Sequence, residues 1–102
     1  MDYPPFSRLA NILVRASKEE KAIELINRIN NDLKEFKEKN NYSYEILGPT
    51  PAAHSKLRRL FRWQVLLKGR PDEVLLASRS IRNYYIPKGI FVSIDIDPQS
   101  VL

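Results

Sequence analysis

The 102-residue sequence contains no cysteine. A disulfide-stabilised scaffold and a zinc site built from cysteine are therefore excluded. No apolar run approaches the roughly 18 residues of a membrane-spanning helix, and the first ten residues, MDYPPFSRLA, lack the apolar core of a signal peptide. We therefore expect a soluble intracellular protein without a membrane partner. Its length favours a single domain over residues 1–102.

Acidic residues are absent from one long stretch, Ile46–Arg70, which contains six basic residues. The whole chain has 17 basic and 12 acidic residues, a net charge of +5 and a pI of about 9.6. Outside this stretch the charges nearly cancel, so the stretch accounts for the positive charge. This pattern favours an acidic partner, with nucleic acid as the first candidate. The alternative is a small basic domain without a particular acidic partner.

Hydrophobic periodicity predicts four strands and two helices in the order β-α-β-β-α-β. The predicted strands cover residues 7–16, 42–47, 61–68 and 90–97, and the predicted helices cover residues 18–40 and 71–86. Ser17 and Glu20 form a capping-box pattern at the first helix. The order fits an α+β, ferredoxin-like split β-α-β-β-α-β fold, with a four-stranded sheet and both helices on one face. The turn residues Gly48–Pro51 predict a long basic loop between the second and third strands.

The face of the predicted sheet that carries no helix has several large apolar residues. An open face of this kind suggests contact with another domain or subunit. By alternation, the candidate interdomain contacts are Leu9, Leu13, Leu66 and Phe91.

The basic segment supplies the candidate phosphate contacts, because arginine offers a planar fork of donors and lysine a compact charge. These candidates are Lys56, Arg58, Arg59 and Arg62. The alternative is a solvated loop, or one that packs on an acidic surface of another domain.

Other residues with chemical potential receive structural interpretations. Trp63 has the ring to stack on a base, but it alternates in phase with Phe61 and Val65, so we expect core packing. Asp95 and Asp97 point to one face, as metal ligands would, but no third ligand lies near them in the sequence. For them we expect solvation or a salt bridge. No catalytic constellation is present in the pattern.

Three segments in order, YPPFSRLANILVR, LGPTPAAHSKLRRLFRWQVLLKG and IDIDPQSVL, resemble the C-terminal domain of primosomal protein N′ (PriA), the bacterial replication-restart DNA helicase. The most specific parts are RWQ with its following apolar run and the terminal D-x-D-P. The resemblance covers nearly the whole chain. It implies a fold similar to that of a ribosomal small-subunit protein, which is compatible with the split βαβ arrangement.

The resemblance also implies partners: branched (fork) DNA, the helicase core of the parent protein, and the C-terminal tail of single-stranded DNA-binding protein (SSB). The implied location is the bacterial cytoplasm, with association to the nucleoid during restart. In the family, contacts to the SSB tail lie near the start of the second helix. This chain has Arg70-Pro71-Asp72-Glu73-Val74 there, with two acids.

The parent family is an ATP-dependent 3′–5′ helicase that uses ATP, Mg²⁺ and Zn²⁺ through a phosphate-binding loop and a cysteine-rich zinc module. This sequence has neither G-x-x-x-x-G-K-[ST] nor cysteine. We therefore expect no cofactor and no enzymatic activity in this chain alone. Two other functions stay open: a protein-interaction module that grips the acidic SSB tail, and, by fold analogy alone, a free-standing RNA-binding domain.

Overall fold

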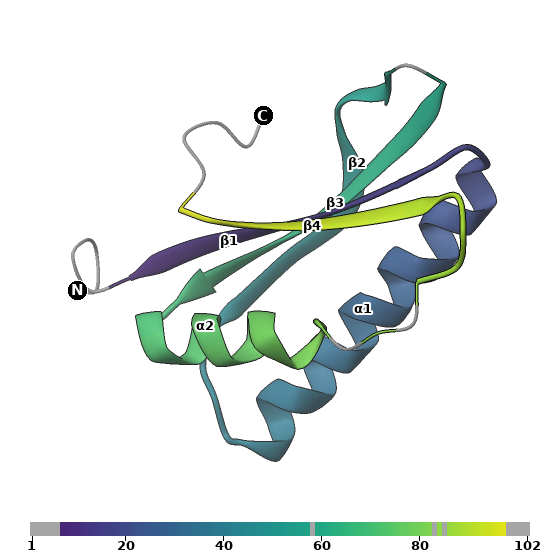
Figure 1. Cartoon of the computed structure of the whole chain (residues 1–102). Coiled ribbons are helices and arrows are strands. Elements are labelled where there is room, and N and C mark those ends of the chain that lie inside the picture. Colours follow the sequence, from purple (N-terminus) through teal and green to yellow (C-terminus); the bar gives the residue numbers. More distant parts are fainter. Residues whose placement is uncertain (1–6, 58, 83, 85, 98–102) are drawn as a thin grey trace.

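The fold alternates strands and helices in the predicted order, β-α-β-β-α-β (Figure 1). The structure, a computed structural model, describes residues 7–57, 59–82, 84 and 86–97, and for residues 53–57 it describes the backbone alone. The elements are β1 (Arg8–Ala16), α1 (Glu19–Lys39), β2 (Glu45–Leu57), β3 (Leu60–Gly69), α2 (Pro71–Ser80) and β4 (Ile90–Ile96).

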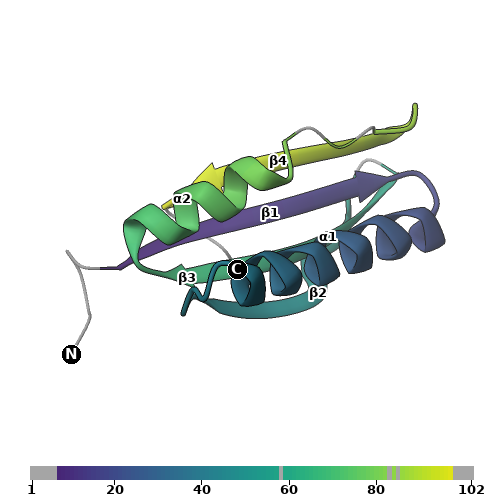
Figure 2. The ribbon, with the colours of Figure 1, turned by 90° about the horizontal axis from the view of Figure 1, so that it is seen from below.

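The four strands form one antiparallel sheet with the order β2-β3-β1-β4. Both helices lie on the same face of this sheet (Figures 1 and 2). This arrangement confirms the predicted ferredoxin-like α+β fold. Neither helix in the described part of the chain is long and apolar enough to cross a membrane.

The core lies between the sheet and the helices and is built from alternate residues of the two central strands. Ile12 and Val14 of β1 and Val65 and Leu67 of β3 are fully buried. The buried residues of the helices are Ala22, Leu25, Ile26, Ile29 and Leu33 in α1 and Val74 and Ala77 in α2, with Ile81 just beyond α2. The strand residues recur with a period of two and the helix residues with a period of 3.6, and both sets pack into one apolar layer. This layer supplies the hydrophobic stabilisation of the fold.

The second strand is much longer than predicted. β2 continues through the Gly-Pro segment to Leu57, and only residues 58–59 separate it from β3. Its pairing with β3 shifts on either side of Thr50-Pro51. β2 is an edge strand, which tolerates prolines without an N–H, and bulges absorb the extra residues. The prediction of a long basic loop between the second and third strands is therefore wrong, and the basic segment is a β-hairpin.

Each helix differs from its prediction at one end. α1 begins at Glu19 with Lys18 as its N-cap and without a side-chain cap, so the predicted capping by Ser17 is absent. α2 ends at Ser80, well before the predicted stop at Pro87. The Ser80 hydroxyl donates to the carbonyl of Ala77 at 2.6 Å, and such local bonds compete with helix continuation.

Tyr44 ties the start of β2 to the end of α1. Its side chain is fully buried, and its hydroxyl donates to the carbonyl of Leu33 at 2.6 Å. Gly69 makes room for it, because a Cβ at residue 69 would lie 2.8 Å from the Cα of Tyr44. Burial raises the pKa of Tyr44 to about 12, and the nearby charge of Glu73 acts in the same direction.

Tyr44→Phe is expected to lower the free energy of unfolding near pH 8 by about 1 kcal/mol, because it removes a buried hydrogen bond. Above about pH 10 the unfolded chain ionises its tyrosine while the folded chain keeps Tyr44 protonated, so wild-type stability falls as the pH rises toward 12. The variant has no tyrosine at this position and therefore lacks this pH-dependent loss of stability. Urea unfolding at about pH 8 and about pH 11.5 should show the gap between the two proteins narrowing; a constant or wider gap contradicts the prediction.

Candidate nucleic-acid interface

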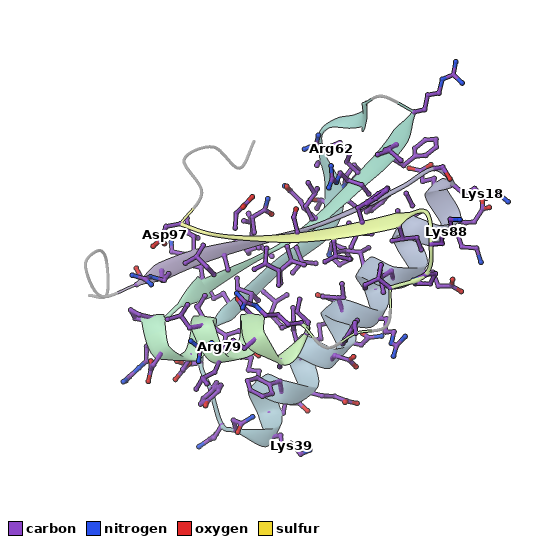
Figure 3. All side chains as sticks on the ribbon, in the orientation of Figure 1. Lys18, Lys39, Arg62, Arg79, Lys88 and Asp97 are labelled. Atoms are coloured by element: carbon purple, nitrogen blue, oxygen red, sulfur yellow. The ribbon has the colours of Figure 1, made fainter. Side chains whose placement is uncertain are left out.

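One end of the sheet brings together basic residues from separate parts of the sequence. β1 ends there and both β3 and β4 begin there, because Ala16 is the Cα partner of Phe61 and of Ile90. Lys18 and Lys88 lie at this end, and Arg62 lies on its hairpin side (Figure 3). We define the hairpin end as the β2–β3 hairpin (residues 56–62), the start of α1 and the segment 87–91.

The predicted DNA contacts are divided between two positions within the hairpin end. Arg59 is exposed at the turn with a φ of 67°, a conformation that a two-residue hairpin turn of type I′ requires at this position. Arg62 is half-buried on the face of the sheet that carries no helix. The backbone of Lys56 pairs with Phe61 in β2, while its side chain and Arg58 lie outside the described residues.

A cleft of about 580 Å³ opens at the hairpin end between the start of α1 and the segment before β4. The charged residues among its described lining are Lys18, Lys21, Glu24, Arg28 and Lys88. Four of these five are cations. The sequence analysis missed this cleft, because only the packing of β4 against β1 brings residue 88 near residue 18.

Trp63 lies on the helix side of the sheet and packs against the core. Its indole N–H donates to the Oε2 of Glu19 at 3.2 Å. This position confirms the predicted core packing.

The helix-free face carries the residues that alternation predicted. The candidate interdomain contacts Leu9, Leu13 and Leu66 are half-buried there, and Phe91 is 48% exposed. Leu47 lies opposite Leu66 and is 49% exposed. The sequence analysis did not name Leu47, although its alternation with the inward Ile46 indicated this face.

Two arginines lie side by side on this face. Arg15 and Arg62 are Cα partners in the β1–β3 ladder. The Nε of each is buried and has no hydrogen-bond partner in the part of the chain that the structure describes. The guanidinium carbon of Arg15 lies 5.5 Å from the centroid of the Phe91 ring. Sequence reasoning singled out Arg62 alone, because only the strand register brings Arg15 to it.

The start of α2, at the opposite end of the sheet, is neutralised by its own acids. The Nε of Arg70 lies 3.6 Å from Asp72 Oδ1 and 3.9 Å from Glu73 Oε2. Glu73 is nearly buried and also accepts the N–H of Ser43 at 2.8 Å. The basic residue here is thus already paired with two carboxylates, which disfavours an acidic peptide at this position.

Asp97 has a structural environment. Its Oδ1 accepts the N–H of Leu9 at 3.0 Å, and its Oδ2 lies 3.1 Å from the Nε of Arg8. Asp95 is exposed, and the described residues hold no group of three or more His, Cys, Asp or Glu side chains suited to a metal. The predicted salt bridge is confirmed for Asp97.

Comparisons with known proteins give one consistent family. Residues 1–99 match the family described as the primosomal protein N C-terminal domain. The chain is 29% identical over 103 residues to the replication restart protein PriA of Synechocystis sp. (strain ATCC 27184 / PCC 6803 / Kazusa), covering 99% of this chain and 12% of that protein. It is 31% identical over 102 residues to the replication restart protein PriA of Chlamydia pneumoniae, covering 97% of this chain and 13% of that protein. The chain thus spans about an eighth of the length of these relatives.

A solved structure has the same fold. The de novo designed protein Foldit4 superposes with a TM-score of 0.58 at 19% sequence identity, covering 92% of this chain and 99% of that chain. At this identity the likeness concerns the fold alone.

Asp97→Ala is expected to lower the free energy of unfolding by about 1–2 kcal/mol. It removes the bond to the Leu9 N–H and the contact with Arg8, and it places alanine at a φ of 53°. Asp97→Asn keeps an acceptor and tolerates the left-handed backbone, so its loss should be smaller. Urea unfolding of both variants measures this order, and an asparagine variant less stable than the alanine variant would refute it.

Proposed function

The chain belongs to the primosomal protein N C-terminal domain family, and on that premise we propose that it is the DNA-binding and docking domain of a replication-restart helicase. In this proposal the hairpin end holds the phosphate backbone of branched DNA in the bacterial cytoplasm, and the helix-free face contacts the helicase core. The chain itself catalyses no step. ATP hydrolysis and unwinding, with their ATP, Mg²⁺ and Zn²⁺, belong to other parts of the parent protein.

The observation that carries this proposal is the gathering of cations at the hairpin end. The hairpin contributes Arg59, next to Arg58 in the sequence, and the cleft contributes Lys18, Lys21 and Lys88. Phosphate oxygens are the counter-charge that such clusters bind in nucleic acids. The proposed phosphate contacts are Lys56, Arg58, Arg59 and Arg62, supported by the lysines of the cleft.

The proposed recognition is by charge and shape. Contacts to phosphates position a protein on DNA but carry no direct sequence information. The hairpin and the cleft both carry basic residues and lie at one end of the domain, as Arg62, Lys18 and Lys88 do in Figure 3, so they suit two diverging arms of a branched molecule. We therefore favour fork DNA over a plain duplex.

The proposed docking surface is the apolar part of the helix-free face. Leu9, Leu13 and Leu66 contribute to it together with Leu47, which is 49% exposed. The chain spans about an eighth of its relatives, so a parent protein of that length has other domains to cover this face. An exposed apolar patch on a small domain is typical of such an interface.

The alternative function, binding of the acidic SSB tail by this chain alone, receives less support. Arg70 at the start of α2 is already paired with Asp72 and Glu73. A tail bound at this position would need further cations from other domains of the parent protein.

Wild-type protein is expected to bind labelled fork DNA with a strong salt dependence. If about four phosphates are neutralised, the logarithm of the affinity falls with the logarithm of salt concentration with a slope of roughly −3.6. Arg58→Gln/Arg59→Gln should reduce this slope to about −1.8 and weaken binding at low salt. Fluorescence anisotropy over a salt series measures both effects.

Arg79→Gln/Arg82→Gln is the matched control, since it removes the same charge from exposed positions in the last turn of α2 and just beyond it. It should change the slope by less than about 0.5. Circular dichroism checks that both double variants fold. A wild-type chain that binds no DNA at low salt, or a hairpin variant indistinguishable from this control, would exclude the proposal. Binding of an SSB-tail peptide without DNA binding would favour the alternative.

A further inference from the structure

The arginine pair on the helix-free face has no counter-charge in the described chain. Arg15 and Arg62 lie directly opposite each other, and like charges at such positions destabilise a sheet. Neither forms an ion pair with an acid among the described residues, and the Nε of each is buried without a partner. The bulged part of β2 beside Arg62, residues 52–55, reads Ala-Ala-His-Ser and contains no acid. No acid among the described residues therefore offsets the charge of this pair, which leaves it available to an anion.

An anionic oxygen group is the partner that this geometry fits. The guanidinium group is planar and presents its donors in a fixed fork, which matches phosphate and carboxylate oxygens. An oxyanion held between the two side chains would accept hydrogen bonds from both and offset their repulsion. Phosphate and carboxylate both meet this description, so the neighbouring residues decide between them.

Phe91 is the next residue in the same row of the sheet. It is the Cα partner of Arg15 on β4, and its side chain is 48% exposed. The row from Arg62 through Arg15 to Phe91 crosses three neighbouring strands and is about 10 Å long. Cations beside an exposed aromatic ring are the combination with which proteins hold the phosphates and stack the bases of a single strand.

We propose that this row, the Arg62–Arg15–Phe91 row, binds one nucleotide unit of single-stranded DNA, with its phosphate on the arginine pair and its base on the Phe91 ring. Nucleic acid is favoured over a protein carboxylate because Arg62 follows Arg59 of the hairpin by three residues. A DNA strand bound by the row can thus extend directly to the proposed phosphate contacts of the hairpin end. In a duplex the bases stack on one another and cannot stack on Phe91, so the row selects a single strand.

This inference rests on the proposed function and adds Arg15 and Phe91 to its DNA contacts. Phe91 then belongs to the site for single-stranded DNA rather than to the docking surface. The docking surface consists of the leucines farther along the same face. The two central strands carry no outward aromatic ring, so the site differs from a stacking platform on β1 and β3.

If the arginine pair serves binding rather than folding, replacing one arginine should raise the stability of the domain. Arg62→Gln removes the like-charge pair and one buried Nε that has no partner among the described residues, and it leaves Arg15 against the Phe91 ring. The variant should therefore melt about 2–5 °C above the wild type. It should also bind a single strand about tenfold more weakly. A residue with a merely structural role would lose stability instead.

The test is fluorescence anisotropy of the whole chain at low salt, with a labelled oligothymidylate of about 15 nucleotides and a blunt duplex of the same length. Arg15→Gln should weaken binding of the single strand about tenfold. Phe91→Leu should weaken it about 5- to 100-fold and leave duplex binding unchanged, and Phe91→Trp should restore it. Arg79→Gln removes one exposed charge on α2 and serves as the control, with changes below about twofold.

The outcomes separate this inference from the proposed function. If the hairpin double variant loses DNA binding while Arg15→Gln and Phe91→Leu keep full affinity for the single strand, the row is excluded and the proposed function stands. If the wild-type chain binds neither probe, both are excluded. The proposed row is also excluded if Phe91→Leu loses equal affinity for the single strand and the duplex, because Phe91 would then have no role specific to a single strand. It is likewise excluded if Arg62→Gln melts at a lower temperature than the wild type, because Arg62 would then have a structural role.

Discussion

The antiparallel pairing of β1 with β3 is the constraint on which the rest of the structure depends. It runs without a shift from Arg8 opposite Gly69 to Ala16 opposite Phe61, so the two strands alternate in phase over their whole length. Ile12 and Val65 pair under the helices, while Arg15 and Arg62 pair on the other face. A slip of one residue in either strand would turn its core residues to solvent. The apolar layer thereby fixes where both arginines lie.

Core packing outweighs the repulsion that it imposes. Full burial of one large aliphatic side chain contributes about 1.5–3 kcal/mol, whereas a like-charge pair across strands costs about 1 kcal/mol or less. Charges are paired at the other end of the sheet, where Asp97 contacts Arg8 and Arg70 lies between Asp72 and Glu73. Basic residues are thus paired with acids at one end of the sheet, while basic residues gather at the hairpin end; in the proposed function this difference orients the domain toward DNA.

The edge position of β2 links the sequence of the basic segment to its proposed use. An edge strand accepts Pro49 and Pro51, because their missing N–H groups need not face a neighbouring strand. The register shifts then absorb the extra residues before the chain turns at Arg59. The basic residues are thus carried on a paired hairpin rather than on a free loop. In the proposed function this pairing lowers the conformational entropy that would be lost on binding phosphates.

The sequence by itself determined the order of the elements, the inward faces of the strands and the core position of Trp63. These features follow from local periodicity, because alternation decides which side of a strand each residue faces. Only the tertiary structure decided the length of β2, the pairing of Arg15 with Arg62 and the cleft that joins Lys18 to Lys88. The prolines of β2 indicate a turn when read locally, since the edge position that tolerates them is a property of the assembled sheet. The pairing and the cleft depend on strand register and on contacts between distant segments, which no local pattern encodes.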